Sequence, residues 1–224
     1  MIRLEAVERH YAMSGQTVCA LAGIDLHIAS GEFAAITGPS GSGKSSLLNV
    51  LGCLDRPTKG RYLLADQDVA LLDDDQASTI RNRKIGFIFQ SFHLLPRLSV
   101  LENVLLPRRF LRETIEGLEA RARMLLERVG LADRIDHRPN ELSGGQMQRA
   151  AIARSLLLQP ALLLADEPTG NLDSRSAADV LALLEEVHAG GQTIVLVTHD
   201  NDVAARATRR IHLRDGKVCD DAHR

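Results

Sequence analysis

Gly38-Pro39-Ser40-Gly41-Ser42-Gly43-Lys44-Ser45 fits the phosphate-binding pattern GxxxxGK[S/T], and it follows an apolar run, residues 33–37, that predicts a strand. Glycines let the backbone approach a ligand closely, so successive N–H groups can point at phosphate oxygens beside the positive end of the next helix. We therefore expect Lys44 to contact the β- and γ-phosphates of a nucleotide and Ser45 to offer its hydroxyl to Mg²⁺. A flexible turn is the alternative, and the preceding strand-like run makes it the weaker one.

The composition limits the class of partners. The chain has 224 residues, which suffices for one large domain or a core with a small lobe. Its formal net charge is −2 with 25% charged residues, whereas nucleic-acid-binding domains are strongly basic, so no nucleic-acid partner is expected. Cys19, Cys53 and Cys219 are odd in number and form no CxxC pattern, which predicts reduced, packed thiols without a disulfide or zinc site.

The hydropathy pattern predicts a location in the cytoplasm. The first five residues alternate polar and apolar types, unlike the basic and then apolar blocks of a signal peptide. No apolar run approaches the ~20 residues of a membrane-spanning helix. If the protein serves a membrane process, we expect another chain to span the membrane.

Apolar runs and turn signals predict alternating strands and helices. Strands are expected at residues 2–7, 18–28, 33–37, 61–64, 85–89, 161–165, 193–198 and 209–213, and helices at 44–51, 73–83, 114–129, 144–158 and 174–187. The turn at residues 215–216 predicts a final hairpin. Between residues 91 and 139 the alternation stops, which predicts a helical lobe inserted between strands.

Local signals predict details of this lobe and of the later helix. Thr114 can cap a helix with one apolar face, and Gly130 ends it. Ser174 can cap the helix that follows the polar turn 171–173. The cluster at the lobe's entrance is either core, which we favour for most of its members, or a docking surface. Its members are Phe92, Leu94, Leu95, Leu98 and Val100.

Polar residues follow two of the predicted central strands. Asp166 and Glu167 end a continuous apolar run, and adjacent carboxylates there are costly to place unless something uses them. Asp166 can hold Mg²⁺ and Glu167 can polarise an attacking water. Surface exposure of both is the alternative, which the apolar run disfavours. His199 ends the next strand at the sheet edge where a ligand is expected, although a lone His is more often structural.

Three further features have two interpretations on physical grounds alone. Tyr11 can stack on a base, but half-buried packing is commoner for a tyrosine near a strand end. Gln90, at a strand end, is by itself an ordinary loop residue. Ser143-Gly144-Gly145-Gln146 opens a helix, where free N–H groups can form a second anion site or the start of a capped helix.

Taken in order, these features resemble the ATP-binding cassette (ABC) ATPases, the nucleotide-binding subunits of transporters. The most specific element is Leu142-Ser143-Gly144-Gly145-Gln146, which other P-loop NTPases lack. The segments 52–57, 81–87 and 168–173 resemble the branch that powers lipoprotein release and macrolide-type export. Ser46, where many relatives carry Thr, and Met147, where Gln is frequent, depart from the pattern without touching the expected chemistry.

The resemblance implies one α/β domain over residues 1–224. It comprises a P-loop NTPase core, about residues 1–90 and 159–224, with a mixed, mainly parallel central sheet and an N-terminal antiparallel β subdomain. A helical subdomain, about residues 91–158, is inserted. Its first part, near residues 90–105, would receive a helix of a membrane permease.

The resemblance also implies site residues and partners. Two copies would form a head-to-tail homodimer with two ATP molecules in the interface. The P-loop and Ser46 of one copy would bind each ATP, and Ser143, Gly144, Gly145 and Gln146 of the other copy would close the site. Tyr11 would stack on adenine, Gln90 would join Ser45 and Asp166 at Mg²⁺, Asp173 would contact the other copy, and His199 would contact the γ-phosphate and water.

The expected function is ATP hydrolysis by Glu167, coupled through dimer closure to a separate permease at the inner face of the cell membrane, for export or extraction of envelope substrates. A mechanical switch of the cell-division type, acting through a membrane protein, is the alternative. A soluble cassette of DNA repair or translation is less favoured, because such chains usually carry tandem cassettes or long inserts.

Overall fold

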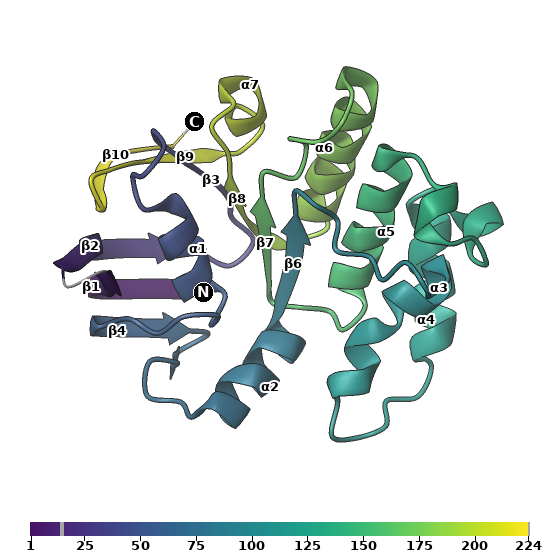
Figure 1. Ribbon diagram of the computed structural model, residues 1–224, viewed down its shortest axis with the longest axis horizontal. Helices are drawn as coiled ribbons and strands as arrows, with labels where there is room; N and C mark the ends of the chain where they lie inside the picture. The colour runs from purple at the N-terminus through teal and green to yellow at the C-terminus, as the bar shows by residue number, and fades with distance from the viewer. Residues whose placement is uncertain (14–15, 224) are drawn as a thin grey trace.

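Two sheets form the framework of the protein. The computed structural model describes residues 1–13 and 16–223. Within them one sheet has the strand order β10-β9-β3-β8-β7-β6 and the other the order β2-β1-β4-β5. Figure 1 shows the two sheets side by side, with helix α1 between them, helix α2 at the bottom of the view and helices α3 to α6 beyond β6 and β7. The expected α/β class with a mixed, mainly parallel central sheet and an antiparallel N-terminal sheet is confirmed.

The larger sheet is parallel except at one edge. Its parallel strands are β3 (Phe33–Thr37), β6 (Ile85–Phe89), β7 (Leu162–Asp166), β8 (Thr193–Val197) and β9 (Arg209–Arg214), and β10 (Lys217–His223) pairs antiparallel with β9. Every residue of β3 and β8 is buried, because helices or the second sheet cover both faces. This double burial explains the continuous apolar runs of the sequence.

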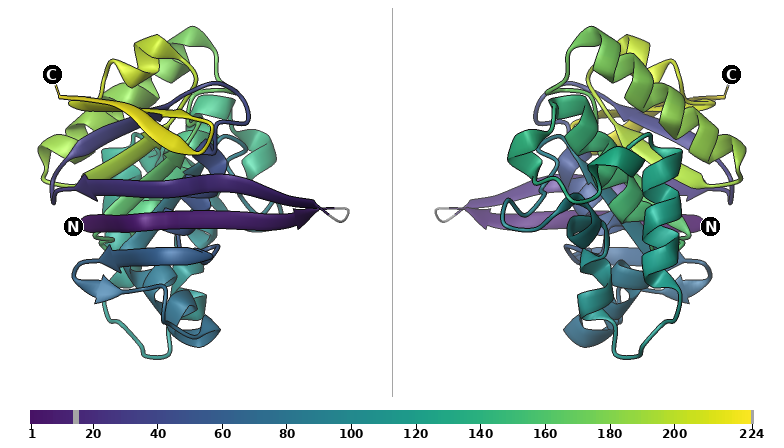
Figure 2. Two further views of the ribbon diagram at one scale, coloured as in Figure 1. Left: turned by 90° about the vertical axis from the view of Figure 1, so that its left-hand side faces the viewer. Right: turned by 90° about the vertical axis from the view of Figure 1, so that its right-hand side faces the viewer.

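The smaller sheet is antiparallel and lies against α1. Its strands are β1 (Ile2–Met13), β2 (Gln16–Ile28), β4 (Lys59–Leu64) and β5 (Gln67–Asp68). Figure 2 shows β1 and β2 as a long ribbon that projects past the rest of the molecule. The buried residues of β1, β2 and β4 share one apolar core with α1.

The helices divide between the two faces of the larger sheet. Helix α1 (Lys44–Leu51) buries Leu47, Leu48, Val50 and Leu51 in the core shared with the smaller sheet. A second core lies on the other face and includes residues of α3, α4, α5 and α6. The other helical segments are α2 (Asp74–Lys84), α3 (Val100–Val104), η1 (Leu106–Phe110), α4 (Leu118–Arg128), η2 (Ala132–Arg134), η3 (Pro139–Glu141), α5 (Gly144–Leu156), α6 (Ser174–Ala189) and α7 (Asn201–Ala204).

Two predicted helix caps are wrong. Thr114 does not cap α4, which begins at Leu118 after Gly117, whose φ of 75° is a left-handed conformation that glycine adopts without strain. Ser174 is the first residue of α6, and the cap is Asp173, whose carboxylate accepts from the N–H groups of Arg175 and Ser176. Ser143, in contrast, caps α5 as its sequence indicates.

Two predictions of burial are also wrong. Within the cluster that we expected to be mostly core, only Val100 is fully buried, while Leu94 is partly buried against the core and Phe92 lies in a loop with a positive φ. The three thiols are free, as expected, but Cys19 and Cys219 are exposed. They lie on the outer parts of the β1–β2 ribbon and on the edge strand β10. Over the described residues, no helix is both long and apolar enough to cross a membrane.

Candidate active site

The P-loop connects β3 to α1 and has the shape of an anion-binding loop. Gly38 has a φ of 146°, and a Cβ there would lie 2.2 Å from the carbonyl oxygen of Leu213. Gly43 has a φ of 103° and a similar close approach, 2.5 Å, to the carbonyl oxygen of Ala20. Only glycine fits both positions. The loop therefore brings backbone N–H groups and the N-terminus of α1 to one place, as phosphate binding requires.

Lys44 folds back over this loop. Its Nζ donates to the carbonyl oxygens of Gly38 and Pro39, each at 2.8 Å. The buried hydroxyl of Ser42 has no hydrogen-bond partner. A cationic amine held at the mouth of a loop of N–H donors is suited to a polyphosphate. A phosphate could replace the two carbonyls as the partner of Lys44.

Parallel pairing aligns the ends of three strands beside the P-loop. Phe89 pairs with Asp166 and Asp166 pairs with Val197, so Gln90, Glu167 and Thr198 follow at one sheet edge. Partial burial, and then the neighbouring Glu167 carboxylate, raise the pKa of Asp166, while Lys44 lowers it. A cation would favour the ionised form of this carboxylate. Within the described chain, no three His, Cys, Asp or Glu side chains lie together as a metal site.

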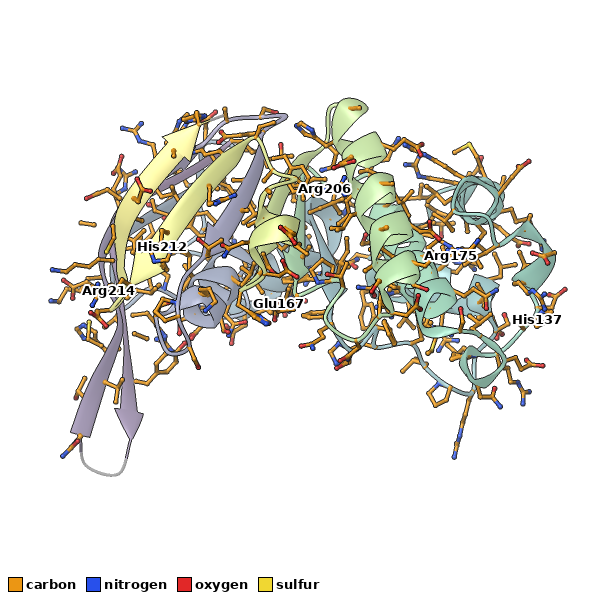
Figure 3. All side chains as sticks on the ribbon, turned by 90° about the horizontal axis from the view of Figure 1, so that it is seen from above. His137, Glu167, Arg175, Arg206, His212 and Arg214 are labelled. Atoms are coloured by element: carbon orange, nitrogen blue, oxygen red, sulfur yellow. The ribbon has the colours of Figure 1, made fainter. Side chains whose placement is uncertain are left out.

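Glu167, which is labelled in Figure 3, is held in place by its neighbours. Its φ is 44°, which is unusual for a residue with a Cβ, and its N–H donates to the carbonyl oxygen of Val197. One carboxylate oxygen accepts from the hydroxyl of Thr198 at 3.0 Å. The other accepts from the N–H of His199 at 3.0 Å and lies 2.6 Å from its Nδ1. The sequence indicated Glu167 and His199 separately but not this contact, and it gave no signal for Thr198.

Gln90 and the loop after it are joined to more distant segments. Gln90 and Asn171 form two hydrogen bonds, since Gln90 Nε2 donates to Asn171 Oδ1 and Asn171 Nδ2 donates to the main-chain carbonyl oxygen of Gln90. Arg154 of α5 donates to the carbonyl oxygens of Phe92 and His93. Burial lowers the pKa of Arg154, so these acceptors are its compensation for lost water.

Ser143 to Gln146 form the capped start of α5. Ser143 Oγ accepts from the N–H of Gln146, and Gln146 Oε1 accepts from the N–H of Ser143. A Cβ at Gly145 would lie 2.8 Å from Ser176 Oγ, so this turn packs closely on α6. Hydrogen bonds from Ser176 lower the pKa of Asp173. Helix α5 shares the core opposite to that of α1, so the structure does not bring this segment and the P-loop together within one chain.

The profile of the family described as "ABC transporter" matches residues 21–170, which include the P-loop, Gln90, the Ser143 turn and both carboxylates. The chain belongs to the ABC transporter family. As an ABC cassette, it is 50% identical over 222 residues to the macrolide export ATP-binding/permease protein MacB of Hyphomonas neptunium, covering 99% of this chain and 34% of MacB. It thus spans about a third of that relative.

Other relatives match over nearly their whole length. An uncharacterised ABC transporter ATP-binding protein, YvrO of Bacillus subtilis, is 49% identical over 97% of this chain and 95% of YvrO. A solved dimeric structure of MJ0796, described as a bacterial ABC transporter cassette, has a TM-score of 0.90 at 44% identity, covering 100% of this chain and 98% of MJ0796. A second dimeric MJ0796 structure is described as a post-hydrolysis state bound to ADP and Pi.

Tyr11 of this ABC cassette has a partner that the sequence did not reveal. Its hydroxyl donates to Asp55 Oδ2 at 2.8 Å, and Arg9 pairs with both oxygens of the same carboxylate. The guanidinium carbon of Arg9 lies 4.6 Å from the centre of the Tyr11 ring. Tyr11 is half-buried, as its position on the strand suggested, and these contacts hold its ring in one orientation.

Proposed function

We propose that this chain is the ATP-hydrolysing subunit of an ABC transporter. The observation that carries the proposal is the carboxylate of Glu167, held by Thr198 and His199 at the sheet edge beside a phosphate-binding loop. The family match and the ADP- and Pi-bound state of MJ0796 support it. The proposed division into a core, residues 1–90 and 159–224, and a helical subdomain, residues 91–158, follows the same family resemblance.

ATP binding would use the loop and the start of α1. The backbone N–H groups of residues 38–43 and the hydroxyls of Ser45 and Ser46 would face the phosphates, while Lys44 would leave its two carbonyl partners for phosphate oxygens. The ring of Tyr11, held by Asp55 and packed against Arg9, would stack on adenine.

The residues present fit a magnesium ion. Ser45, Gln90 and Asp166 supply oxygen atoms, which are the ligands that Mg²⁺ prefers. Burial and the neighbouring Glu167 raise the pKa of Asp166 more than Lys44 lowers it, so a bound cation would favour the ionised carboxylate. When bound, Mg²⁺ would polarise the phosphate oxygens and neutralise part of their charge.

Glu167 would act as general base. Its carboxylate would accept a proton from a water molecule that attacks the γ-phosphate, and Thr198 and His199 would fix the direction in which it points. The exposed His199 ring would also contact the γ-phosphate. Removing a general base typically lowers the rate ~10²- to 10⁴-fold, so phosphate release by Glu167→Gln should fall by that order while ATP still binds. Wild-type phosphate release by this variant would refute the assignment.

A second copy would complete the site. Ser143, Gly144, Gly145 and Gln146 lie across the sheet from α1 in their own chain, so a head-to-tail pair would place them over the partner's P-loop, with Asp173 at the same interface. The dimeric MJ0796 structures support this arrangement.

The permease is the remaining partner. The MacB relative is described as a macrolide export ATP-binding/permease protein, which supports export and a peripheral location on the inner membrane face, with residues 90–105 receiving a permease helix. Detergent pull-down of the tagged chain from its native membrane, with and without ATP, tests this partner. Recovery of a permease with a large periplasmic domain is expected. Recovery of only soluble proteins or nucleic acid would refute the transport role.

A further inference from the structure

Gln148 of α5 is a buried residue whose side-chain amide has no role in the site described above. Its exposed fraction is 0%. The side-chain Nε2 donates to the carbonyl oxygen of Pro168 at 2.6 Å and to that of Phe89 at 3.2 Å. Carbonyl oxygens only accept, so the NH₂ end of the amide must face them. The other end, Oε1, is buried without a partner.

The two acceptors belong to the two segments that carry the proposed chemistry. Phe89 directly precedes Gln90, and Pro168 directly follows Glu167. The described pairing between β6 and β7 ends at Phe89 and Asp166, and the Gln148 amide joins the two segments at this end of the strands. Glu167 has a positive φ, a conformation that persists only where surrounding contacts hold it.

The energetics favour a geometric role for this amide. Its unpaired Oε1 has lost water without gaining a partner, which offsets the contribution of the two donated hydrogen bonds to stability. An apolar side chain of similar length would fill the same space without that cost, although the carbonyl oxygens of Phe89 and Pro168 would lose this donor. What such a side chain could not do is hold two carbonyl oxygens at a fixed separation.

We propose that Gln148 is a positioning residue for ATP hydrolysis, which sets the spacing between the segment carrying Gln90 and the segment carrying Glu167. The inference rests on the proposed roles of those two residues. Arg154, on the same helix, holds the carbonyls of Phe92 and His93, so α5 supports the Gln90 loop at two points. Helix α5 also begins with the Ser143 turn, one helical turn before Gln148.

The matched pair of variants is Gln148→Met and Gln192→Met. Gln192 makes the same kind of contact away from the proposed site, because its Nε2 donates to the carbonyl oxygens of Pro160 and Thr193 at 3.1 and 3.3 Å. Both substitutions replace an amide with an unbranched apolar chain. Gln148→Leu serves as a second variant should the methionine pack poorly.

The assays are ATP turnover, thermal unfolding and hydrogen exchange on the full chain. Gln148→Met should lower kcat about 10-fold or more, because misplacement of about 1 Å can cost ~10²-fold, while KM for ATP and the unfolding midpoint stay near those of Gln192→Met. Amide exchange should rise in residues 90–93 and 169–172. Wild-type kcat in both Gln148 variants, or a lower kcat accompanied by a raised KM and general destabilisation, would overturn the inference.

Glu167→Gln, measured in the same assay, separates this inference from the proposed function. If Glu167→Gln is inactive and both Gln148 variants turn over at the wild-type rate, Gln148 has no positioning role and the proposed function stands. If Glu167→Gln hydrolyses ATP normally, the proposed function fails, and the inference fails with it.

Discussion

Gly170 offers a test of how closely the Gln90 side chain must be placed. It lies between Glu167 and Asn171, and its φ lies outside the positive range that disfavours alanine. A Cβ added there would lie 2.7 Å from Gln90 Nε2 and 3.1 Å from its Cδ. Ordinary contact begins at 3.4 Å, so the amide in Gly170→Ala must retreat by about 0.7 Å. The retreat would break the contact with Asn171 Oδ1, which is already 3.2 Å long.

The expected effect of Gly170→Ala is on chemistry and not on folding. A shift approaching 1 Å at a residue proposed to hold Mg²⁺ should lower kcat roughly 10- to 10²-fold and raise the Mg²⁺ concentration needed for half-maximal turnover. The stability change should stay within about 0.5 kcal/mol, as for most surface substitutions.

The assay is phosphate release over a Mg²⁺ titration at saturating ATP, with urea unfolding alongside. Gly190→Ala is the control, because Gly190 also has a negative φ and a Cβ there would approach only carbonyl oxygens of α6, at 3.3 Å or more. Unchanged turnover and unchanged Mg²⁺ dependence in Gly170→Ala would refute the role given to Gln90.

Three further predictions concern stability. The raised pKa of Asp166 means that its charge opposes folding. This penalty is absent below the unfolded pKa of about 3.9 and grows as pH rises towards the folded pKa, so Asp166→Asn should raise the apo thermal midpoint at pH 7 but not at pH 3.5. The variant should also abolish turnover, and a lower midpoint at pH 7 would contradict the prediction. Arg209 donates to both oxygens of Asp221 and to Glu32. Arg209→Met leaves these two carboxylates without their guanidinium partner and should lower the free energy of unfolding in urea by about 3 kcal/mol. Pairing lowers the pKa of Asp221, so its contribution is full above about pH 3.9 and is lost as pH falls through the folded pKa; an effect of Arg209→Met that does not shrink in acid would count against this pairing. Gly86→Ala places a Cβ 2.6 Å from the carbonyl oxygen of Ser155 and should cost about 2 kcal/mol by overpacking, a loss that thermal unfolding would detect and that wild-type stability would disprove.

Local patterns in the sequence were enough to predict the central strands and the P-loop. The runs at residues 33–36 and 194–197 are apolar throughout because both faces of the sheet are covered, and the glycines of the P-loop are needed for positive φ values and close approaches. The prediction that Thr114 caps a helix was wrong because a helix start depends on backbone conformation as well as on a capping side chain. Gly117, in a left-handed conformation, is the residue that directly precedes α4.

The arrangement of the candidate site depends on contacts that no local pattern encodes. Glu167 meets His199, and Gln148 meets Phe89 and Pro168, only after strands and helices from distant parts of the chain have packed. Tyr11 likewise finds Asp55 across 44 residues. The sequence alone indicates which residue types are present, whereas tertiary packing determines which of them touch.

The central claim is that ATP joins two copies of this chain and that Glu167 ends the joined state by hydrolysis. Light scattering of purified Glu167→Gln, with and without Mg-ATP, tests it directly, with nucleotide content measured in the same fractions. We expect a monomer without nucleotide, and with ATP a dimer that retains two unhydrolysed ATP molecules. A monomer at saturating ATP, or a dimer that contains ADP, would contradict it.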